Sequence, residues 1–213
     1  CEEGRSNHSW KDICEEMQKC PCNFVLINDR NLFTNDTKTN RNPKGIRNVI
    51  SILDCLLPVN FTDNRFEVVI ATEENKGPDK IKHDEILNNL SIEFAKIRNY
   101  KIHLVLLFYN FETPHYDATH NRRVSTNYGI VKADHKIAAF RTNGESDADQ
   151  SILYQSLYAE GIVNSSDIPE EDQMLFLRRM CQIYHAIKKE GKPGIIVHSE
   201  SCDRDPRFLK LFS

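Results

Sequence analysis

Cysteine offers this chain its widest choice of chemistry, because a thiol can act as a nucleophile, bind a metal or close a disulfide. Seven cysteines are spread over the 213 residues, and an odd number cannot pair completely within one chain. Cys14, Cys20 and Cys22 are crowded together, but no second pair follows at zinc-finger spacing. The sequence therefore predicts no metal site, and the thiols favour a reduced, cytoplasmic protein.

Five Asn-x-Ser/Thr motifs point to the opposite compartment, because such motifs accept N-linked glycans in secreted proteins. They begin at Asn7, Asn35, Asn60, Asn89 and Asn164. The chain is rich in Asn, so several are expected by chance, and Asn89 falls within a strong helix pattern. Secretion stays open as the alternative location.

Several function classes are disfavoured by composition. The net charge of −3 is close to balance, and no basic patch interleaved with aromatic residues suggests a nucleic-acid partner. The longest apolar runs, such as 104–108, are far too short to cross a bilayer, so no membrane partner is expected. No glycine-rich phosphate loop is present, and no cofactor is predicted.

The apolar pattern predicts an α/β protein. Short apolar runs indicate strands at 23–27, 66–71, 102–108 and 194–197, and a hairpin around Asp134. Three- and four-residue spacing predicts helices over 45–57, from Gly77 and Pro78 to 97, and over 167–190. The almost continuous apolar run at 102–108 is typical of a parallel sheet covered on both faces. We expect a polar, Cys-rich segment at 1–22 and one domain over 23–213.

The order of these elements resembles the large subunit of caspases. Lys192-Pro193-Gly194-Ile195-Ile196-Val197 is similar to the strand that ends in the family's Gln-Ala-Cys-Arg-Gly signature. Earlier segments also resemble the family, namely Phe24 to Asn31, Lys44-Gly45, Phe66 to Ala71 and Leu104 to Leu107. The resemblance covers most of 23–202 and implies a three-layer α/β/α domain. Its sheet would be mostly parallel with strand order 2-1-3-4, and an insertion would lie around 111–160.

The resemblance assigns functional positions, and the residues there are substituted. In caspases a thiolate attacks a peptide carbonyl with the help of a His. Tyr109 falls at the His position and Ser201 at the nucleophile, with Cys202 adjacent. Lys44 and Ser199 fall at the Arg and Gln of the substrate pocket. Tyr is a poor general base at neutral pH, and Lys lacks the planar fork that holds a carboxylate at two points.

These substitutions imply a non-catalytic caspase homologue, not an enzyme, that regulates an active caspase or its activation platform in cell death. Its partner would be a caspase or a caspase-like small subunit, in a homo- or heterodimer. One alternative is an active cysteine endopeptidase that uses Cys202. Another is a secreted binding domain like a von Willebrand type A module, although residues 28–32 do not match that family's Asp-x-Ser-x-Ser motif.

Overall fold

The computed structural model describes residues 9–14, 22–40, 42–62, 65–74, 76–140, 152–157 and 169–199, together with 205, 206 and 209. Its helices are α1 (Trp10–Cys14), α2 (Lys44–Leu56), α3 (His83–Ile97) and α4 (Pro169–Glu190), and a 3-10 helix η2 (Tyr116–His120) follows β3. Its strands are β1 (Phe24–Asn28), β2 (Phe66–Glu73), β3 (Ile102–Tyr109), β4 (Arg123–Thr126), β5 (Gly129–Ala133), β6 (Ile152–Ser156) and β7 (Gly194–His198). The apolar pattern located β1, β2, β3, β7, α2 and α4 to within about two residues.

The start of α3 and the position of the hairpin differ from the sequence predictions. Pro78 lies in a turn, and Lys80 then pairs with Thr37, so the chain stays extended until α3 begins at His83. The hairpin joins β4 to β5 instead of turning at Asp134. Its turn is held by the hydroxyl of Thr126, which accepts hydrogen bonds from the backbone N–H of Tyr128 and Gly129.

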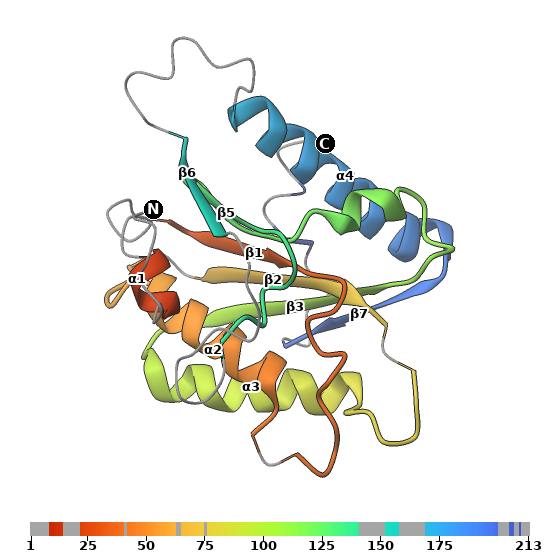
Figure 1. The fold of residues 1–213 in the computed structure, drawn as a ribbon, viewed down its shortest axis with the longest axis horizontal. Coiled ribbons are helices and arrows are strands. Elements are labelled where there is room, and N and C mark those ends of the chain that lie inside the picture. Colours follow the sequence, from red (N-terminus) through yellow and green to blue (C-terminus); the bar gives the residue numbers. More distant parts are fainter. Residues whose placement is uncertain are drawn as a thin grey trace.

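The α/β class is confirmed, but the strand order predicted from the caspase resemblance is wrong. The seven strands run β6-β5-β4-β1-β2-β3-β7, so β1, β2 and β3 are neighbours in chain order (Figure 1). In the predicted 2-1-3-4 order, the chain would reverse direction after its second strand. Here α2 and α3 both lie on one face of the sheet. Two right-handed crossovers on the same face each place the next strand on the same side of the preceding strand, which gives the order β1-β2-β3.

The sheet is also not mostly parallel. Only β1 with β2 and β2 with β3 are parallel, whereas the other four strand pairs are antiparallel. Helix α4 explains the direction of β7. Its 22 residues span about 33 Å across the opposite face, and the chain leaves it beside the carboxyl end of β3. The strand that follows must therefore run back along β3 in the antiparallel sense.

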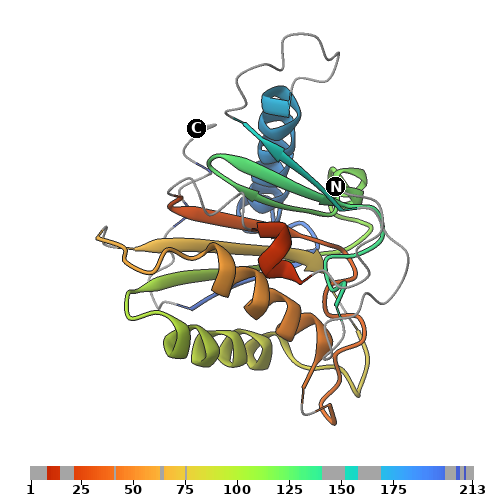
Figure 2. The same ribbon diagram turned by 60° about the vertical axis from the view of Figure 1, so that its left-hand side comes forward.

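Two apolar layers enclose the central strands, which are buried almost throughout (Figure 2). Odd-numbered positions of β1 pack toward α1, α2 and α3, where Trp10, Val49 and Leu90 belong to the larger core. Even-numbered positions pack toward α4, where Phe176, Met180 and Tyr184 form the second core. Burial on both faces was expected for β3 from its continuous apolar run.

Polar side chains of β4 are buried beneath α4. The hydroxyl of Ser125 donates to Gln173, and the Arg123 guanidinium donates to Asp172 over 3.2 Å. The same guanidinium lies 4.2 Å from the centre of the Phe176 ring. Asp172 also pairs with Lys132 on β5, so one carboxylate connects α4 to two strands. Arg123 is 1% exposed, which makes this carboxylate its essential counter-charge.

Removal of that carboxylate is expected to destabilise the domain. In Asp172→Ala the buried Arg123 loses its partner, and we expect the free energy of unfolding at pH 7 to fall by about 2 kcal/mol, less than for a fully buried pair because Asp172 is partly exposed. Burial raises the pKa of Asp172, but Lys132 and Arg123 lower it more, and the net shift is downward. The contribution of this ion pair to the free energy of unfolding is thus fully present above the unfolded pKa of about 3.9. It is lost as the pH falls through the folded pKa of Asp172.

Urea unfolding at pH 7 and pH 3 measures this effect. The gap between Asp172→Ala and the wild type should narrow at pH 3, because the stability contributed by a carboxylate with a lowered folded pKa declines once the pH falls below the unfolded pKa of about 3.9. Asp117→Ala, at an exposed position of η2, should change neither value. A gap of equal size at both pH values would contradict the ionic role of Asp172.

Candidate functional site

The carboxyl ends of β1, β2 and β3 form the edge at which α/β proteins usually bind ligands. Asn28 ends β1, Glu73 ends β2 and Tyr109 ends β3. The segment from β3 to β4, including η2, lies against this edge and contacts α4 (Figure 1). The chemistry available here depends on which side chains keep free polar groups.

Tyr109, the residue at the position of the caspase His, is completely buried. Its hydroxyl donates a hydrogen bond to Asn28 Oδ1 over 3.3 Å. Burial is the main cause that raises the pKa of the Tyr109 phenol well above its ordinary value. The phenol is therefore protonated at neutral pH and has no surface on which to meet a substrate. It serves as a structural group of the second core.

Asn28 ties the following loop to the sheet. Its amide nitrogen donates to the carbonyl oxygens of Thr119 and Asn121, over 3.1 and 2.7 Å, and its oxygen accepts from Tyr109. The side chain is completely buried, and all three contacts are within the chain. At β1 the carboxyl edge is thus closed by η2.

Asp29 performs the same role on the other side of β1. The carboxylate is completely buried and accepts hydrogen bonds from the backbone N–H of Asn31 and Ile137, over 2.9 and 2.6 Å. Burial raises its pKa, whereas these two hydrogen bonds and the Arg122 guanidinium lower it, and the net shift is upward. Asp29 therefore holds the segment after β5 against the start of the first loop.

A polar cluster of Arg30, Glu73, Tyr116 and His120 forms the solvent-facing part of this edge. Arg30 Nε lies 3.3 Å from Glu73 Oε2, and the Tyr116 hydroxyl donates to the same oxygen over 3.1 Å. The Arg30 guanidinium also lies 3.2 Å from a ring nitrogen of His120 and 5.7 Å from the centre of the Tyr116 ring. Arg30 Nε is paired with Glu73 by charge but makes no hydrogen bond within the described residues, whereas the Tyr116 hydroxyl and the Glu73 carboxylate are hydrogen-bonded to each other. Most polar groups of this cluster are therefore paired internally.

Of the predicted site residues that the structure describes, Tyr109 and Ser199 are not brought together. Tyr109 is paired with Gly194 at the start of β7, whereas Ser199 follows the end of β7 and is hydrogen-bonded to Leu104. Five residues of strand, about 17 Å, separate these two ends. Lys44 is the half-buried first residue of α2. Ser201 and Cys202 lie outside the described residues.

A buried polar chain lies at the opposite edge, beside Ser199. His103 Nδ1 lies 3.9 Å from Glu67 Oε1 and has no hydrogen-bond partner within the described residues. Its other ring nitrogen lies 3.4 Å from His198 Nδ1, and the two rings are stacked. Arg65 contacts the Glu67 carboxylate over 2.7 Å. The sequence analysis did not single out Glu67, His103 or His198, although polar residues within apolar strand runs were a visible signal.

The cysteines that the structure describes are poor nucleophiles. Cys14, Cys22, Cys55 and Cys181 are thiols rather than disulfide halves, and Cys55 alone among them is more than slightly exposed. Burial raises the pKa of Cys14 and Cys55, and raises that of Cys181 to about 12. The thiolate is the reactive form, so these groups are unreactive at neutral pH. Within the described residues, no three His, Cys, Asp or Glu side chains are placed to hold a metal ion.

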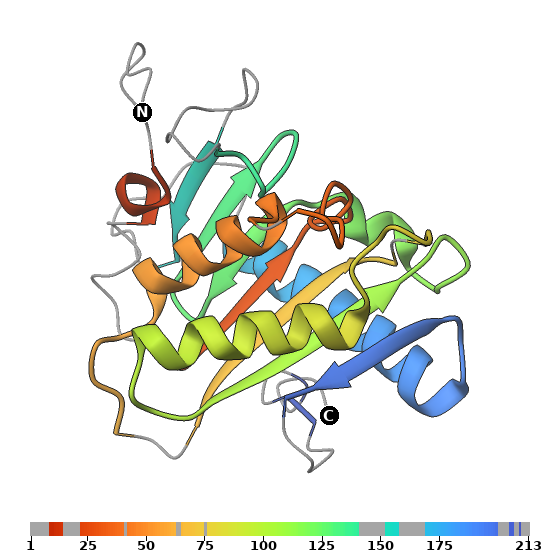
Figure 3. The same ribbon diagram turned by 90° about the horizontal axis from the view of Figure 1, so that it is seen from below.

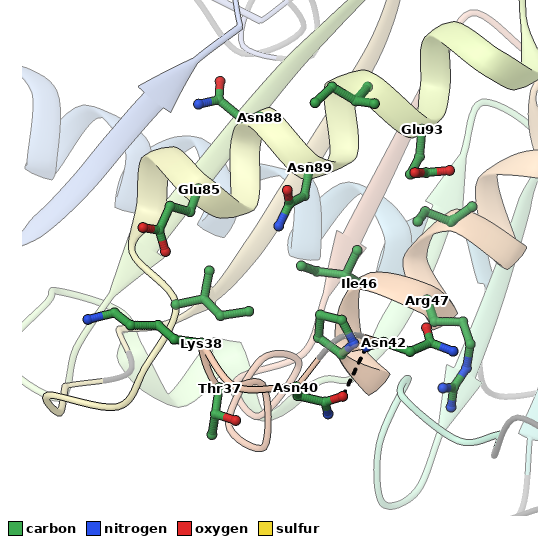
Figure 4. A pocket seen from close by; sticks show the side chains of 14 residues that line it. Thr37, Lys38, Asn40, Asn42, Ile46, Arg47, Glu85, Asn88, Asn89 and Glu93 are labelled. Atoms are coloured by element: carbon green, nitrogen blue, oxygen red, sulfur yellow. Dashed lines mark hydrogen bonds between the residues drawn. The ribbon is translucent and has the colours of Figure 1, made fainter.

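An open groove of about 880 Å³ lies between the loop after β1 and the helices α2 and α3 (Figure 4). Its apolar surface comes from isoleucines and a proline, and its polar surface from four asparagines, a threonine and four charged side chains. These are Ile46, Ile50, Ile81, Ile92, Pro43, Asn40, Asn42, Asn88, Asn89, Thr37, Lys38, Arg47, Glu85 and Glu93. Figure 4 shows Glu85 and Asn89 reaching from α3 toward the loop that carries Lys38. Sequence reasoning did not find this groove.

Comparison with known proteins adds no family assignment to these observations. No protein-family model matches the chain, and no curated protein matches its sequence. None of the described helices has both the length and the apolar composition that a bilayer crossing requires. Of the five glycosylation motifs, those at Asn35, Asn60 and Asn89 present exposed asparagines, whereas Asn7 and Asn164 lie outside the described residues.

Proposed function

We propose that this chain is a non-catalytic α/β domain that acts by binding another protein in the groove between the first loop, α2 and α3. The observation that carries the proposal is the state of Tyr109, which is buried, protonated and hydrogen-bonded to Asn28. A general base must titrate near the working pH and reach the proton that it removes. Tyr109 does neither, and Ser199 lies at the other edge of the sheet.

The groove suits a peptide segment better than a small substrate. Its lining combines isoleucines and a proline with asparagines and charged side chains, and protein interfaces likewise combine apolar and polar residues. Positive side chains, Lys38 and Arg47, come from the loop and α2, while Glu85 and Glu93 come from α3. A bound segment would therefore meet both signs of charge, and asparagine amides can pair with both polar groups of an extended backbone.

The caspase resemblance supplies the first partner to test. The strand order of the domain differs from the one that the resemblance implies, so the proposed partner rests on the sequence segments alone. An active caspase, or a caspase-like small subunit, would be the bound protein, and the domain would regulate it without cleaving peptides. If the bound protein is a caspase, the domain would regulate cell death through it.

Ile92→Arg is expected to weaken partner binding at least about tenfold, because it places a charge and a long side chain on the apolar wall of the groove. Ile92 is 57% exposed on α3, so the fold should not change. Immobilised wild-type and variant chains are compared for binding of purified active caspases. Val59→Arg, at an exposed position after α2, is the matched control and should bind as the wild type does. Equal binding by both variants would exclude the groove, and the absence of caspase binding by the wild type would remove the proposed partner.

The non-catalytic part of the proposal has its own test. The chain is incubated with a thiol-directed peptide inhibitor and analysed by mass spectrometry. We expect no selective labelling at neutral pH. Selective labelling of Cys202 would show an activated thiol and would establish the alternative, a working cysteine peptidase.

A further inference from the structure

One glycosylation motif, Asn60-Phe61-Thr62, lies in the loop that joins α2 to β2, and the proposed function gives it no role. Asn-x-Ser/Thr is the acceptor motif for N-linked glycans, which are bulky surface groups on loops of secreted proteins. With 19 Asn and 22 Ser or Thr among 213 residues, about two such motifs are expected by chance. The chain has five, so chance explains fewer than half of them.

Residues 57–62 of this loop are held at the amino ends of β2 and β3, beside the loop that joins α3 to β3 (Figure 3). The centre of the Phe61 ring lies 5.2 Å from that of Phe66 and 5.3 Å from that of Tyr100. The Pro58 carbonyl oxygen accepts hydrogen bonds from the Tyr100 hydroxyl over 2.7 Å and from Arg98 Nε over 3.1 Å. The middle residue of the motif is thus anchored against the larger core, and the motif occupies a defined place on the surface.

The two residues that define the motif face solvent. Asn60 and Thr62 are both exposed, on either side of the half-buried Phe61. The preceding residue, Val59, is 75% exposed, so a sugar attached to Asn60 would also cover apolar surface. The acceptor amide is therefore accessible in the folded chain, and the ring between the two recognised residues keeps them apart from the core.

Among the motifs that the structure describes, Asn60 is the one at which a glycan disturbs least. Asn35 precedes Asp36, whose buried carboxylate caps α2, and Asn89 lines the groove of the proposed function. Asn60 follows the last turn of α2, and the 13 residues of that helix place about 20 Å between its two ends. The loop side of the groove lies at the first turn, so a glycan on Asn60 would leave the groove open.

We infer that Asn60 is an acceptor for an N-linked glycan. In the transfer, the side-chain nitrogen of Asn60 forms a bond to C1 of an N-acetylglucosamine, and C1 loses its bond to the diphosphate of a lipid-linked oligosaccharide. The lipid diphosphate departs, and the amide nitrogen gives up one proton. This transfer takes place in the secretory pathway, so a glycan on Asn60 would exclude a strictly cytoplasmic partner without closing the groove. The inference therefore goes beyond the proposed function.

Peptide mapping of the protein isolated from the cells that produce it tests this inference. Trypsin releases Asn60 in peptide 48–65, whereas the motifs at Asn35 and Asn89 fall in peptides 31–38 and 83–96. A peptide N-glycosidase converts a glycosylated Asn to Asp, and in heavy-oxygen water the new carboxyl keeps one heavy oxygen. We expect this label at position 60, and not in a digest made without the glycosidase. Peptide 48–65 with an unmodified Asn60 would overturn the inference.

A pair of variants tests whether the motif itself directs the modification. Thr62 is exposed, so neither Thr62→Ala nor Thr62→Ser should change the fold. When the chain is secreted from a eukaryotic cell, Thr62→Ala should lose the mass of one glycan and Thr62→Ser should keep it. Equal glycan mass on the wild type and on Thr62→Ala would contradict the assignment. Caspase binding is measured on chains made without glycosylation, so failure of the proposed function and absence of the glycan are separate results.

Discussion

Gly45→Ala is expected to lower the free energy of unfolding by about 3 kcal/mol, at the upper end for an added methyl group in a packed site. A Cβ on Gly45 would lie 2.2 Å from the carbonyl oxygen of Leu32 and 2.8 Å from both a carboxylate oxygen of Asp36 and a ring carbon of Phe33. The first of these is a backbone atom, which no rotamer change can move away. The first turn of α2 must therefore shift.

The shift is resisted by the cap of α2. Asp36 accepts hydrogen bonds from the backbone N–H of Gly45 and Ile46, over 2.9 and 3.0 Å, and its carboxylate is buried. Moving Gly45 would break these bonds and leave a buried carboxylate with fewer donors. Because Ile46 lines the groove, the same shift should also weaken partner binding.

Gly191→Ala provides the matched control for Gly45→Ala. Gly191 has a φ of 64°, and a Cβ added there would meet no atom within 4 Å, so only the left-handed backbone is strained. We expect its cost to be about 1 kcal/mol. Urea unfolding of both variants separates the two causes. Equal destabilisation would show that close approach to Leu32 is not what demands glycine at position 45.

The sequence predicted strands and helices well where apolar residues dominate. β3 and α2 carry continuous or regularly spaced apolar residues, and burial of those residues determines both elements. β4 was missed because its sequence, Arg-Val-Ser-Thr, is polar, and the partners of its buried Arg123 and Ser125 are Asp172 and Gln173, far along the chain. Such long-range pairing leaves no local pattern in the sequence.

The strand order could not be read from the sequence for a different reason. Right-handed crossovers determine the face of the sheet on which a helix packs, but only once it is known on which side of the first strand the second strand lies. Both 2-1-3 and 1-2-3 are compatible with alternating strands and helices. The resemblance favoured the first order, whereas the packing of α2 against α3 on one face produces the second. Tyr109 and Ser199, which the resemblance assigned to one site, lie at opposite ends of the paired strands β3 and β7.

Asp29→Ala is expected to destabilise the domain by about 3 kcal/mol, because it leaves two backbone N–H groups without their acceptor. The carboxylate of Asp29 accepts from Asn31 and Ile137 and lies 3.7 Å from Arg122, and its side chain is inaccessible to solvent. Asp29→Asn keeps one acceptor oxygen but points its NH₂ group at a donor, so its cost should be intermediate. Asp134→Ala, in an exposed turn, should be nearly neutral.

The pH dependence distinguishes Asp29 from a simple cap. Burial raises its folded pKa above the unfolded value of about 3.9, so ionisation is harder in the fold than in the unfolded chain. Wild-type stability should therefore fall as pH rises from the unfolded to the folded pKa, and then level off. Asp29→Asn has no such group, so its deficit relative to the wild type should be largest at low pH and shrink across this window. A deficit that grows with pH would mean that Arg122 and the two N–H donors outweigh burial, and that the carboxylate is held as a stabilised anion.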